Sequence, residues 1–286
     1  MLEQLRYVRI AVDDLEVARR FAIEIVGLQS GEEADGRARF RSDHRAYSLE
    51  FCGPGSSAGP AVGIEVRTEH DLAQARDGLT VRGIATERMT VEDCAMRRCH
   101  AGILFRDTSN NSFELIVRPH SEARRYFPSR DAGIVGLSHV ALGSIASEAD
   151  AAIWTEVLGA RITDRVGRAI YIGWSDAHHH ISLHPTADPP FVAVSYEVED
   201  IDAIMQSNYL LTDRQIRIVR GPGREPCSGQ VFVTFEGPGA SFFSYVTAGP
   251  KMDAGWRPRQ FSGDPGSFCN WGSVSVLPEF GGGESV

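Results

Sequence analysis

The sequence predicts an α+β fold built from two copies of one module. Its 286 residues are enough for two domains of ordinary size, each with its own hydrophobic core. Segments about 130 residues apart share one order of strands and helices. A repeat of this length indicates a duplicated domain, because the repeats of solenoid proteins recur every ~20–50 residues.

The first copy begins with a strand and a helix. Residues 5–12 alternate between apolar and polar side chains as a half-buried strand does, and Asp13-Asp14 offers a cap for the helix that follows. Apolar residues at helical spacing fill residues 15–26 as far as Gly27, which favours a helix end. Further elements are predicted at residues 60–67 (strand), 70–79 (helix) and 103–117 (strand pair).

The second copy repeats this order. Its predicted elements are residues 135–142 (strand), 147–158 (helix, ended by Gly159), 191–199 (strand), 201–211 (helix) and 231–246 (strand pair). The polar residues 119–132 form the expected linker. We therefore expect an N-terminal module at 1–120, a C-terminal module at 133–250, and a tail at 251–286 that packs on a module.

Composition excludes several classes of function. With 29 basic and 38 acidic residues the net charge is −9, which disfavours binding to nucleic acid or to an anionic membrane surface. No apolar run approaches the ~20 residues of a transmembrane helix, and the N-terminus does not resemble a signal peptide. The five cysteines have no spacing typical of a zinc site or a disulfide framework. We expect a cytoplasmic protein without nucleic-acid or membrane partners.

Histidines gather in the second copy, which holds His139, His178, His179, His180 and His184. His139 shares a strand face with apolar neighbours, and so does His179. Imidazoles that point from a sheet into a concavity suit an iron, manganese or zinc site, although core histidines or a solvated turn would give the same pattern. The register that we infer from residue likeness aligns His139 with Arg9 and His179 with Arg45.

Several segments resemble the vicinal oxygen chelate superfamily, and within it the two-domain type I extradiol ring-cleavage dioxygenases, such as 2,3-dihydroxybiphenyl dioxygenases. The resemblance covers nearly the whole chain and rests on residues 5–28, 134–142, 221–239, 256–261 (WRPRQF) and 269–272 (CNWG). It implies two glyoxalase-like modules, each of paired βαβββ motifs that form an open, incomplete barrel. It also implies a homo-oligomeric oxidoreductase in aromatic compound catabolism.

The resemblance further implies Fe(II), or Mn(II), held in the C-terminal module by two histidines and a glutamate. His139 and His179 match the two histidines, whereas Ser244 occupies the position of the glutamate. A neutral hydroxyl is a poor ligand for a divalent ion. Metal is therefore expected to bind weakly or not at all.

Other positions of the implied active site also differ. Glu225 replaces a histidine that follows residues 221–224, and Thr234 replaces a tyrosine. The acid–base histidine expected before His179 is missing, since residues 160–174 contain none. The candidate catalytic residues are Glu225, Thr234 and His180, and the candidate substrate-binding residues are Trp174, Phe242 and Tyr245.

Three hypotheses follow from these differences. The first is a ring-cleavage dioxygenase acting on a catechol-type aromatic and O2, whose metal keeps His139 and His179 and recruits Glu225 or water. The second is a metal-free enzyme with Glu225 as the base, and the third is a module that binds an aromatic ligand without chemistry. We favour the first hypothesis because both histidines persist beside the tail motifs.

The N-terminal module is not expected to bind metal. In the inferred register, Arg9 and Arg45 stand in the histidine positions and Glu114 in the glutamate position. Two guanidinium groups repel a cation, but they can form a buried ion-pair cluster with the carboxylate. The alternative is that all three side chains point to solvent.

Overall fold

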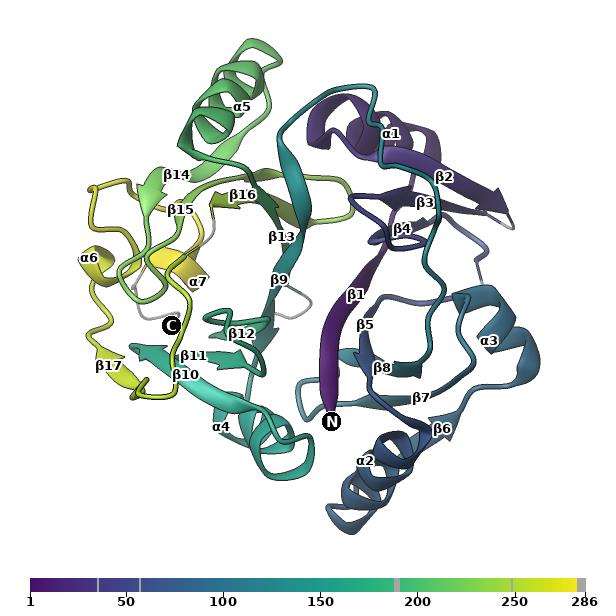
Figure 1. The fold of residues 1–286 in the computed structure, drawn as a ribbon. Helices are drawn as coiled ribbons and strands as arrows, with labels where there is room; N and C mark the ends of the chain where they lie inside the picture. Colours follow the sequence, from purple (N-terminus) through teal and green to yellow (C-terminus); the bar gives the residue numbers. More distant parts are fainter. Residues whose placement is uncertain (35, 57, 188–190, 248, 282–286) are drawn as a thin grey trace. The chain divides into compact units, whose positions relative to one another are not determined.

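In a computed structural model, the chain is described over residues 1–34, 36–56, 58–187, 191–247 and 249–281. It forms two compact units, one of Met1–Arg130 with Ala152–Ala160 and one of Asp131–Ala151 with Arg161–Val286. Each unit holds one open mixed sheet with helices, which confirms the predicted α+β class (Figure 1). No helix in the described part of the chain is long and apolar enough to cross a membrane.

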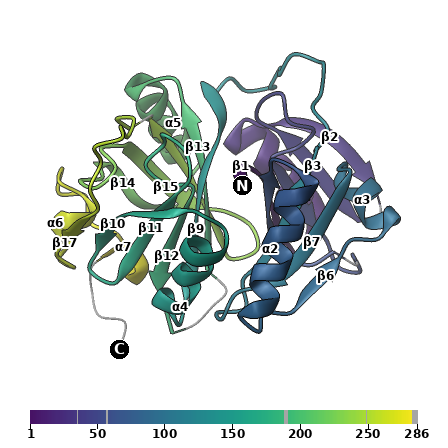
Figure 2. The ribbon, with the colours of Figure 1, turned by 60° about the horizontal axis from the view of Figure 1, so that its bottom comes forward.

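The first unit contains an eight-stranded sheet in the order β2-β3-β4-β1-β5-β8-β7-β6. Its elements are β1 (Leu2–Ala11), α1 (Leu15–Arg20), η1 (Phe21–Val26), β2 (Gln29–Ala34), β3 (Arg37–Arg41), β4 (Leu49–Cys52), β5 (Ala61–Val66), α2 (Glu69–Val81), β6 (Thr86–Arg88), α3 (Val91–Arg97), β7 (Ala101–Arg106) and β8 (Ser112–Val117). Helix α2 lies along β7 in Figure 2.

The second unit contains a nine-stranded sheet in the order β14-β15-β16-β13-β9-β12-β11-β10-β17. The elements from Ile134 onward are β9 (Ile134–Ser144), α4 (Ser147–Ala152), η2 (Ile153–Val157), β10 (Arg161–Val166), β11 (Ala169–Gly173), β12 (Ile181–Pro185), β13 (Val192–Val198), α5 (Ile201–Asp213), β14 (Ile218–Arg224), β15 (Val231–Glu236), β16 (Ser241–Thr247), β17 (Arg259–Phe261), α6 (Pro265–Phe268) and α7 (Pro278–Gly281). Of these, η2 is grouped with the first unit, where Trp154 packs against Phe105 and Phe113.

The two sheets repeat one pairing scheme. In the first, β1 pairs in parallel with β4 and antiparallel with β5, and β5 pairs in parallel with β8. In the second, β9, β12, β13 and β16 pair in the same way. The second sheet is one strand longer because β17, from the tail, adds to the edge of β10. The internal repeat predicted from the sequence is thus present in the strand order.

The first helix of each copy forms where predicted, but its second half is π-helical. Asp14 caps α1 by accepting a hydrogen bond from the amide of Val17, and η1 ends at Gly27 in the left-handed region. In the second copy, α4 continues into η2, and Gly159 also has a positive φ. A left-handed backbone is least costly for glycine, which explains both helix ends.

Strand pairing corrects the register inferred from the sequence. The matching rows, each read across three neighbouring strands, are Tyr7–Gly63–Glu114 and His139–Ser195–Ser244. Glu114 therefore does correspond to Ser244, as expected. The counterpart of His139, however, is Tyr7, and Arg9 lies two residues further along β1.

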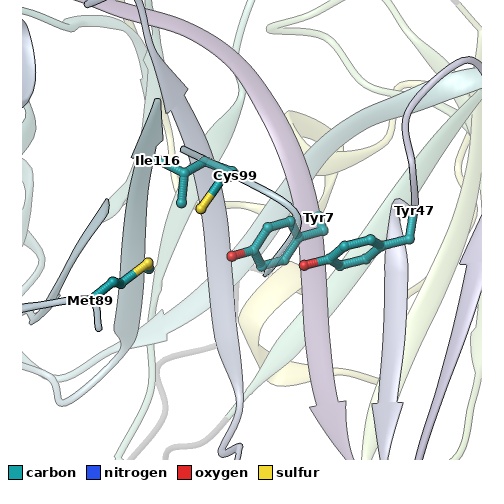
Figure 3. Close-up of a cluster of buried hydrophobic side chains, with 5 residues drawn as sticks. All are labelled: Tyr7, Tyr47, Met89, Cys99 and Ile116. Atoms are coloured by element: carbon teal, nitrogen blue, oxygen red, sulfur yellow. The ribbon is translucent and has the colours of Figure 1, made fainter. Parts of the chain in front are cut away.

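The same two-residue shift holds on the neighbouring strands, where Tyr47 rather than Arg45 corresponds to His179. The rings of Tyr7 and Tyr47 stack with their centroids 4.8 Å apart. Figure 3 shows the two rings side by side in a cluster of buried side chains that includes Met89. In the first unit, two tyrosines therefore fill the positions that hold histidines in the second.

A buried ion-pair network lies beside these tyrosines. Arg9 contacts Glu50 at 2.7 Å and Glu114 at 3.1 Å, and Arg97 contacts Glu114 at 2.7 Å. Burial alone would raise the pKa of Glu114, but Arg9 and Arg97 lower it to about 2. The expected pairing of Arg9 with Glu114 is therefore present. Arg45 takes no part in this network and pairs with Asp43 instead.

Replacing Glu114 by glutamine should destabilise the first unit by about 3–5 kcal/mol, because two buried guanidinium groups lose their shared carboxylate. Urea unfolding followed by circular dichroism measures the change. The control is Glu87→Gln, an exposed carboxylate on β6 of the same sheet, which should stay within about 0.5 kcal/mol of wild type. Equal stability of the Glu114→Gln variant and wild type would contradict the network's role.

Candidate active site

A small cavity lies in the second unit among side chains of β9, β11, β12, β13, β14, β15 and β16. His139, His179 and Ser244 line it, and its volume is about 30 Å³. By the same measure, a cavity needs roughly 10–15 Å³ to hold one water molecule, whereas a cavity that binds benzene measures about 150 Å³. The cavity thus has room for an ion or a water molecule and not for an aromatic ring.

His139 and His179 meet at this cavity. His139 lies on β9 and His179 just before β12, and their ring centroids are 4.1 Å apart. Burial lowers the pKa of His139 to about 3 and holds the pKa of His179 well below its ordinary value. Both imidazoles are therefore neutral near pH 7 and can offer a lone pair to a cation.

Hydrogen bonds occupy one nitrogen of each ring. His139 Nδ1 lies 3.1 Å from Ser138 Oγ, and His179 Nδ1 lies 3.0 Å from His178 Nδ1. Among the residues that the structure describes, none forms a hydrogen bond with Nε2 of either ring. These two Nε2 atoms are the candidate metal-binding atoms.

Ser244 and Thr234 face the cavity from β16 and β15. Their hydroxyl oxygens are 2.8 Å apart, so each hydroxyl is already hydrogen-bonded to the other. Both side chains are buried. The position that corresponds to Glu114 of the first unit thus carries a neutral group.

Glu225 brings a carboxylate to the cavity, but its oxygens are engaged. Tyr171 donates a hydrogen bond of 3.0 Å to Oε1, and Ser228 donates one of 2.6 Å to Oε2. Arg220 lies 3.8 Å from Oε1. Burial would raise the pKa of Glu225, but Arg220 and Ser228 outweigh it, and the pKa lies below its usual range. The carboxylate is therefore ionised, and because both oxygens already accept hydrogen bonds, neither is free to act as a metal ligand or as a base.

These donors do not make the two-histidine, one-carboxylate set that non-haem iron(II) oxygenases use. In the described ranges of the chain, no three His, Cys, Asp or Glu side chains are grouped so as to hold a metal. The donor set offers two imidazoles and a neutral hydroxyl. It fits a weakly held divalent ion and does not fit a tightly bound one.

Four residues expected at the site lie outside the lining of this cavity. His180 stacks on Trp174 with ring centroids 4.1 Å apart, and its Nε2 lies 3.1 Å from Ser175 Oγ. Phe242 packs on other aromatic side chains of the core, and Tyr245 is buried against the neighbouring strand. The structure brings together His139, His179, Ser244, Glu225 and Thr234 and leaves these four apart.

Sequence reasoning missed several residues that line the cavity, among them Tyr171, Arg220 and Phe280. Arg220 is buried with its guanidinium 3.8 Å from the ring centroid of Phe232 and 4.3 Å from that of Phe280. Its position directly before residues 221–224 was a usable signal, because that segment resembles a family motif. Nothing in the sequence pattern singles out Phe280, which comes from the tail.

The tail supplies part of the cavity's lining. Phe280, on α7, lies with its ring centroid 4.5 Å from that of His184 and lines the cavity. The carbonyl oxygen of Glu279 accepts a 3.0 Å hydrogen bond from His184 Nδ1, and the Glu279 carboxylate accepts one of 3.2 Å from Thr186. These contacts fix α7 against β12.

Known protein sequences resemble this chain. Residues 136–242 match the profile of the Glyoxalase/Bleomycin resistance protein/Dioxygenase superfamily. An iron-dependent extradiol dioxygenase of Rhodococcus jostii (strain RHA1) is 28% identical over 239 residues, which cover 76% of this chain and 78% of that protein. A 3-methylcatechol 2,3-dioxygenase of Pseudomonas putida is 27% identical over 185 residues, 61% of this chain and 62% of that protein.

Solved structures resemble the whole chain. BphC, a halotolerant catechol dioxygenase, superimposes with a TM-score of 0.84 at 20% identity, covering 91% of this chain and 92% of that one. A Mn(II)-bound glyoxalase from Novosphingobium aromaticivorans gives a TM-score of 0.85 at 21% identity, with 97% and 93% covered. At such identities the likeness establishes the fold alone.

The stability of the second unit should fall as the pH drops below about 6.5. Burial lowers the pKa of His139 to about 3 and those of His180 and His184 to about 4, with the pKa of His179 also well lowered. The unfolded chain therefore binds protons between pH 6.5 and 4 that the folded chain does not. Each histidine then costs up to about 1.4 kcal/mol per pH unit.

Urea unfolding at pH 7.5, 6.0 and 5.0 measures this slope, and His180→Gln should make it shallower by about one proton. The control is His100→Gln, which removes an exposed histidine of the first unit and should leave the slope unchanged. A slope that His180→Gln leaves equal to wild type would contradict the assignment.

Proposed function

Because residues 136–242 form a domain of the glyoxalase/bleomycin resistance protein/dioxygenase superfamily, we propose that this chain is an extradiol-dioxygenase-like oxidoreductase. Its second unit binds a catechol-type aromatic, with O2 as the second substrate and with Fe(II) or Mn(II) held weakly. The observation that carries this proposal is the convergence of His139 and His179, both neutral, on one cavity. The extradiol dioxygenases among its relatives support the reaction class.

The two histidines would hold the metal through their Nε2 atoms. A divalent ion at that position supplies positive charge to the oxygens of a bound catecholate. Ser244 adds no charge, and Glu225 would have to break hydrogen bonds from Tyr171 and Ser228 to approach. The remaining coordination positions are left to water or substrate, which is why the affinity for metal alone should be low.

Arg220 is the chain's own cation at the cavity. It is buried, and Glu225 at 3.8 Å balances its charge. A guanidinium that lies over aromatic rings can bind both an aromatic ligand and its anionic oxygens. We assign to Arg220 the binding of the substrate's negative charge.

His184 is a candidate proton acceptor at this cavity. Its Nδ1 donates to the carbonyl oxygen of Glu279, so its Nε2 carries a lone pair, and Ser182 Oγ lies 3.0 Å from that atom. Burial lowers the pKa of His184 to about 4, which keeps the ring neutral. Glu225 is a second candidate with the same limits, because its pKa is also lowered and both its oxygens already accept hydrogen bonds. A metal-free reaction with Glu225 as its base would therefore require one of these hydrogen bonds to break.

The tail must move before an aromatic substrate can enter. The cavity of about 30 Å³ is several times smaller than the ~150 Å³ that holds a benzene ring. One of the side chains that line it, Phe280, is itself aromatic and contacts Arg220 and His184. Phe280 thus occupies the place that the proposal gives to the substrate ring.

Phe280→Ala should therefore lower the dissociation constant for 3-methylcatechol at least tenfold, because no ring has to be displaced from Arg220. Equilibrium titration of the metal-free protein measures it, with Phe127→Ala as the control. Phe127 is 72% exposed and belongs to the first unit, so that variant should bind as wild type does. An unchanged constant for Phe280→Ala would show that the ring binds elsewhere.

Ser244→Glu should raise the affinity for Mn(II) by more than the 10–100-fold that outer-shell changes typically produce, since it adds an anionic ligand. Anaerobic titration with Mn(II) compares it with wild type, Ser244→Ala and His139→Ala. Ser244→Ala should leave the affinity unchanged, and His139→Ala should abolish binding. If wild type binds as tightly as Ser244→Glu, another residue, Glu225 first, is the third ligand.

The same proteins test the reaction. Wild type loaded with Fe(II) should cleave 3-methylcatechol in the presence of O2, and His139→Ala should not. Saturable binding of 3-methylcatechol without turnover, at an Fe(II) concentration that fills the site, would replace the proposed enzyme by an aromatic-binding protein.

A further inference from the structure

The tail segment 256–261 reaches a buried carboxylate behind the two histidines. Asp164, on β10, is fully buried, and β17 pairs beside it. The backbone amide of Arg259 donates to Asp164 Oδ1 at 2.7 Å, and its guanidinium donates to Oδ2 at 2.5 Å. Burial would raise the pKa of Asp164, but hydrogen bonds from His178 and Arg259 hold it below its usual range. Asp164 is therefore an ionised carboxylate that only accepts hydrogen bonds.

His178 connects this carboxylate to His179. Its Nε2 lies 3.0 Å from Asp164 Oδ2, and its Nδ1 lies 3.0 Å from His179 Nδ1. The ring is buried, with the indole of Trp256 packed on it at 5.5 Å between centroids. Trp256 is held in turn by a hydrogen bond from its Nε1 to the carbonyl oxygen of Thr163.

The polarity of these hydrogen bonds fixes where the protons sit. Because Asp164 can only accept, Nε2 of His178 must donate. In the neutral ring, Nδ1 of His178 is then an acceptor, so Nδ1 of His179 must carry the hydrogen that lies between them. His179 is thereby left with a bare lone pair on Nε2.

No such constraint acts on the other histidine. The partner of His139 Nδ1 is the hydroxyl of Ser138, which can donate or accept. The tautomer of His139 can therefore change with the ligand that binds in the cavity. The tautomer of His179 is fixed by its hydrogen bond with His178.

We propose that Asp164 and His178 are positioning residues that hold His179 in the Nδ1–H tautomer and so present its Nε2 lone pair to the cavity. The contact between Arg259 and Asp164 gives the tail motif at residues 256–261 a function. It holds Asp164, the first residue in the series of hydrogen bonds that leads through His178 to His179. Outer-shell partners of this kind orient a ligating histidine and raise its basicity. The consequence for metal affinity rests on the proposed function, whereas the tautomer itself does not.

Two variants of His178 separate its two hydrogen bonds. His178→Gln places an amide donor near the Nε2 position and can keep the bond to Asp164, but it removes the acceptor for His179 Nδ1. His178→Asn places an amide oxygen near the Nδ1 position and can keep that acceptor, but it cannot reach Asp164. A role in packing alone would make the two variants equivalent.

The tautomer is measured on metal-free protein labelled with ¹⁵N-histidine, by long-range ¹H–¹⁵N correlation at pH 7.5. The His179 signals are assigned from their absence in His179→Gln. Wild type should show His179 as Nδ1–H and His178 as Nε2–H, and His178→Gln should move His179 toward Nε2–H. An Nε2–H tautomer of His179 in wild type overturns the proposal, whether or not metal binds.

Mn(II) titration supplies the second readout. His178→Gln should weaken Mn(II) binding about 10–100-fold, His178→Asn should weaken it less, and the exposed control His100→Gln should not change it. Equal losses in the two His178 variants, or no loss in either, overturn the positioning role. If wild type binds no Mn(II), the metal site of the proposed function is rejected. The tautomer spectra then still test whether Asp164 and His178 fix the tautomer of His179.

Discussion

Each sheet places polar side chains in the interior of its unit, and the need to satisfy them there governs how both interiors are built. Unpaired polar groups cost several kcal/mol when they leave water, and unpaired charges cost more. The first unit meets this constraint with charge: Glu114 accepts from Arg9, Arg97 and the hydroxyl of Tyr7. The second unit pairs one cation with one anion, Arg220 with Glu225, and the other polar groups of its cavity are neutral, because burial keeps the imidazoles uncharged and the hydroxyls of Thr234 and Ser244 bond each other. One scaffold therefore supports a rigid ionic core and a cavity able to accept a cation.

The sequence predicted the features that depend on neighbouring residues better than those that depend on residues far apart in the chain. The α+β class, the duplication and the first helices followed from local periodicity and glycines at helix ends. The register inferred from the sequence was wrong because likeness of short segments aligned His139 with Arg9, an offset of 139 − 9 = 130 residues. The helix ends Gly27 and Gly159 give 159 − 27 = 132, which is the offset that strand pairing shows. Helix ends are fixed by backbone geometry, so they were the better marker.

Other parts of the site were beyond local patterns. The packing of Phe280 on His184 joins residues about 100 positions apart, and the pairing of Asp164 with Arg259 does the same. Trp174 and His180 were expected at the site because they neighbour its strands, but their rings stack on each other instead. His179 and His180 both lie just before β12, but only His179 lines the cavity, so proximity in sequence did not place His180 at the site.

Charge balance links the metal and the substrate in the proposed function. Arg220 and Glu225 cancel each other, so the cavity is close to neutral, and a divalent ion bound alone would leave two buried positive charges. A doubly ionised catecholate bound alone would leave two negative ones, and the pair together restores neutrality. Each should therefore strengthen the other's binding by the same factor, as linkage requires. With a glutamate at position 244 the metal would already be half neutralised, so the coupling would be smaller. In the proposed function, the absence of a carboxylate at position 244 would therefore shift the holding of the metal from the protein to the substrate.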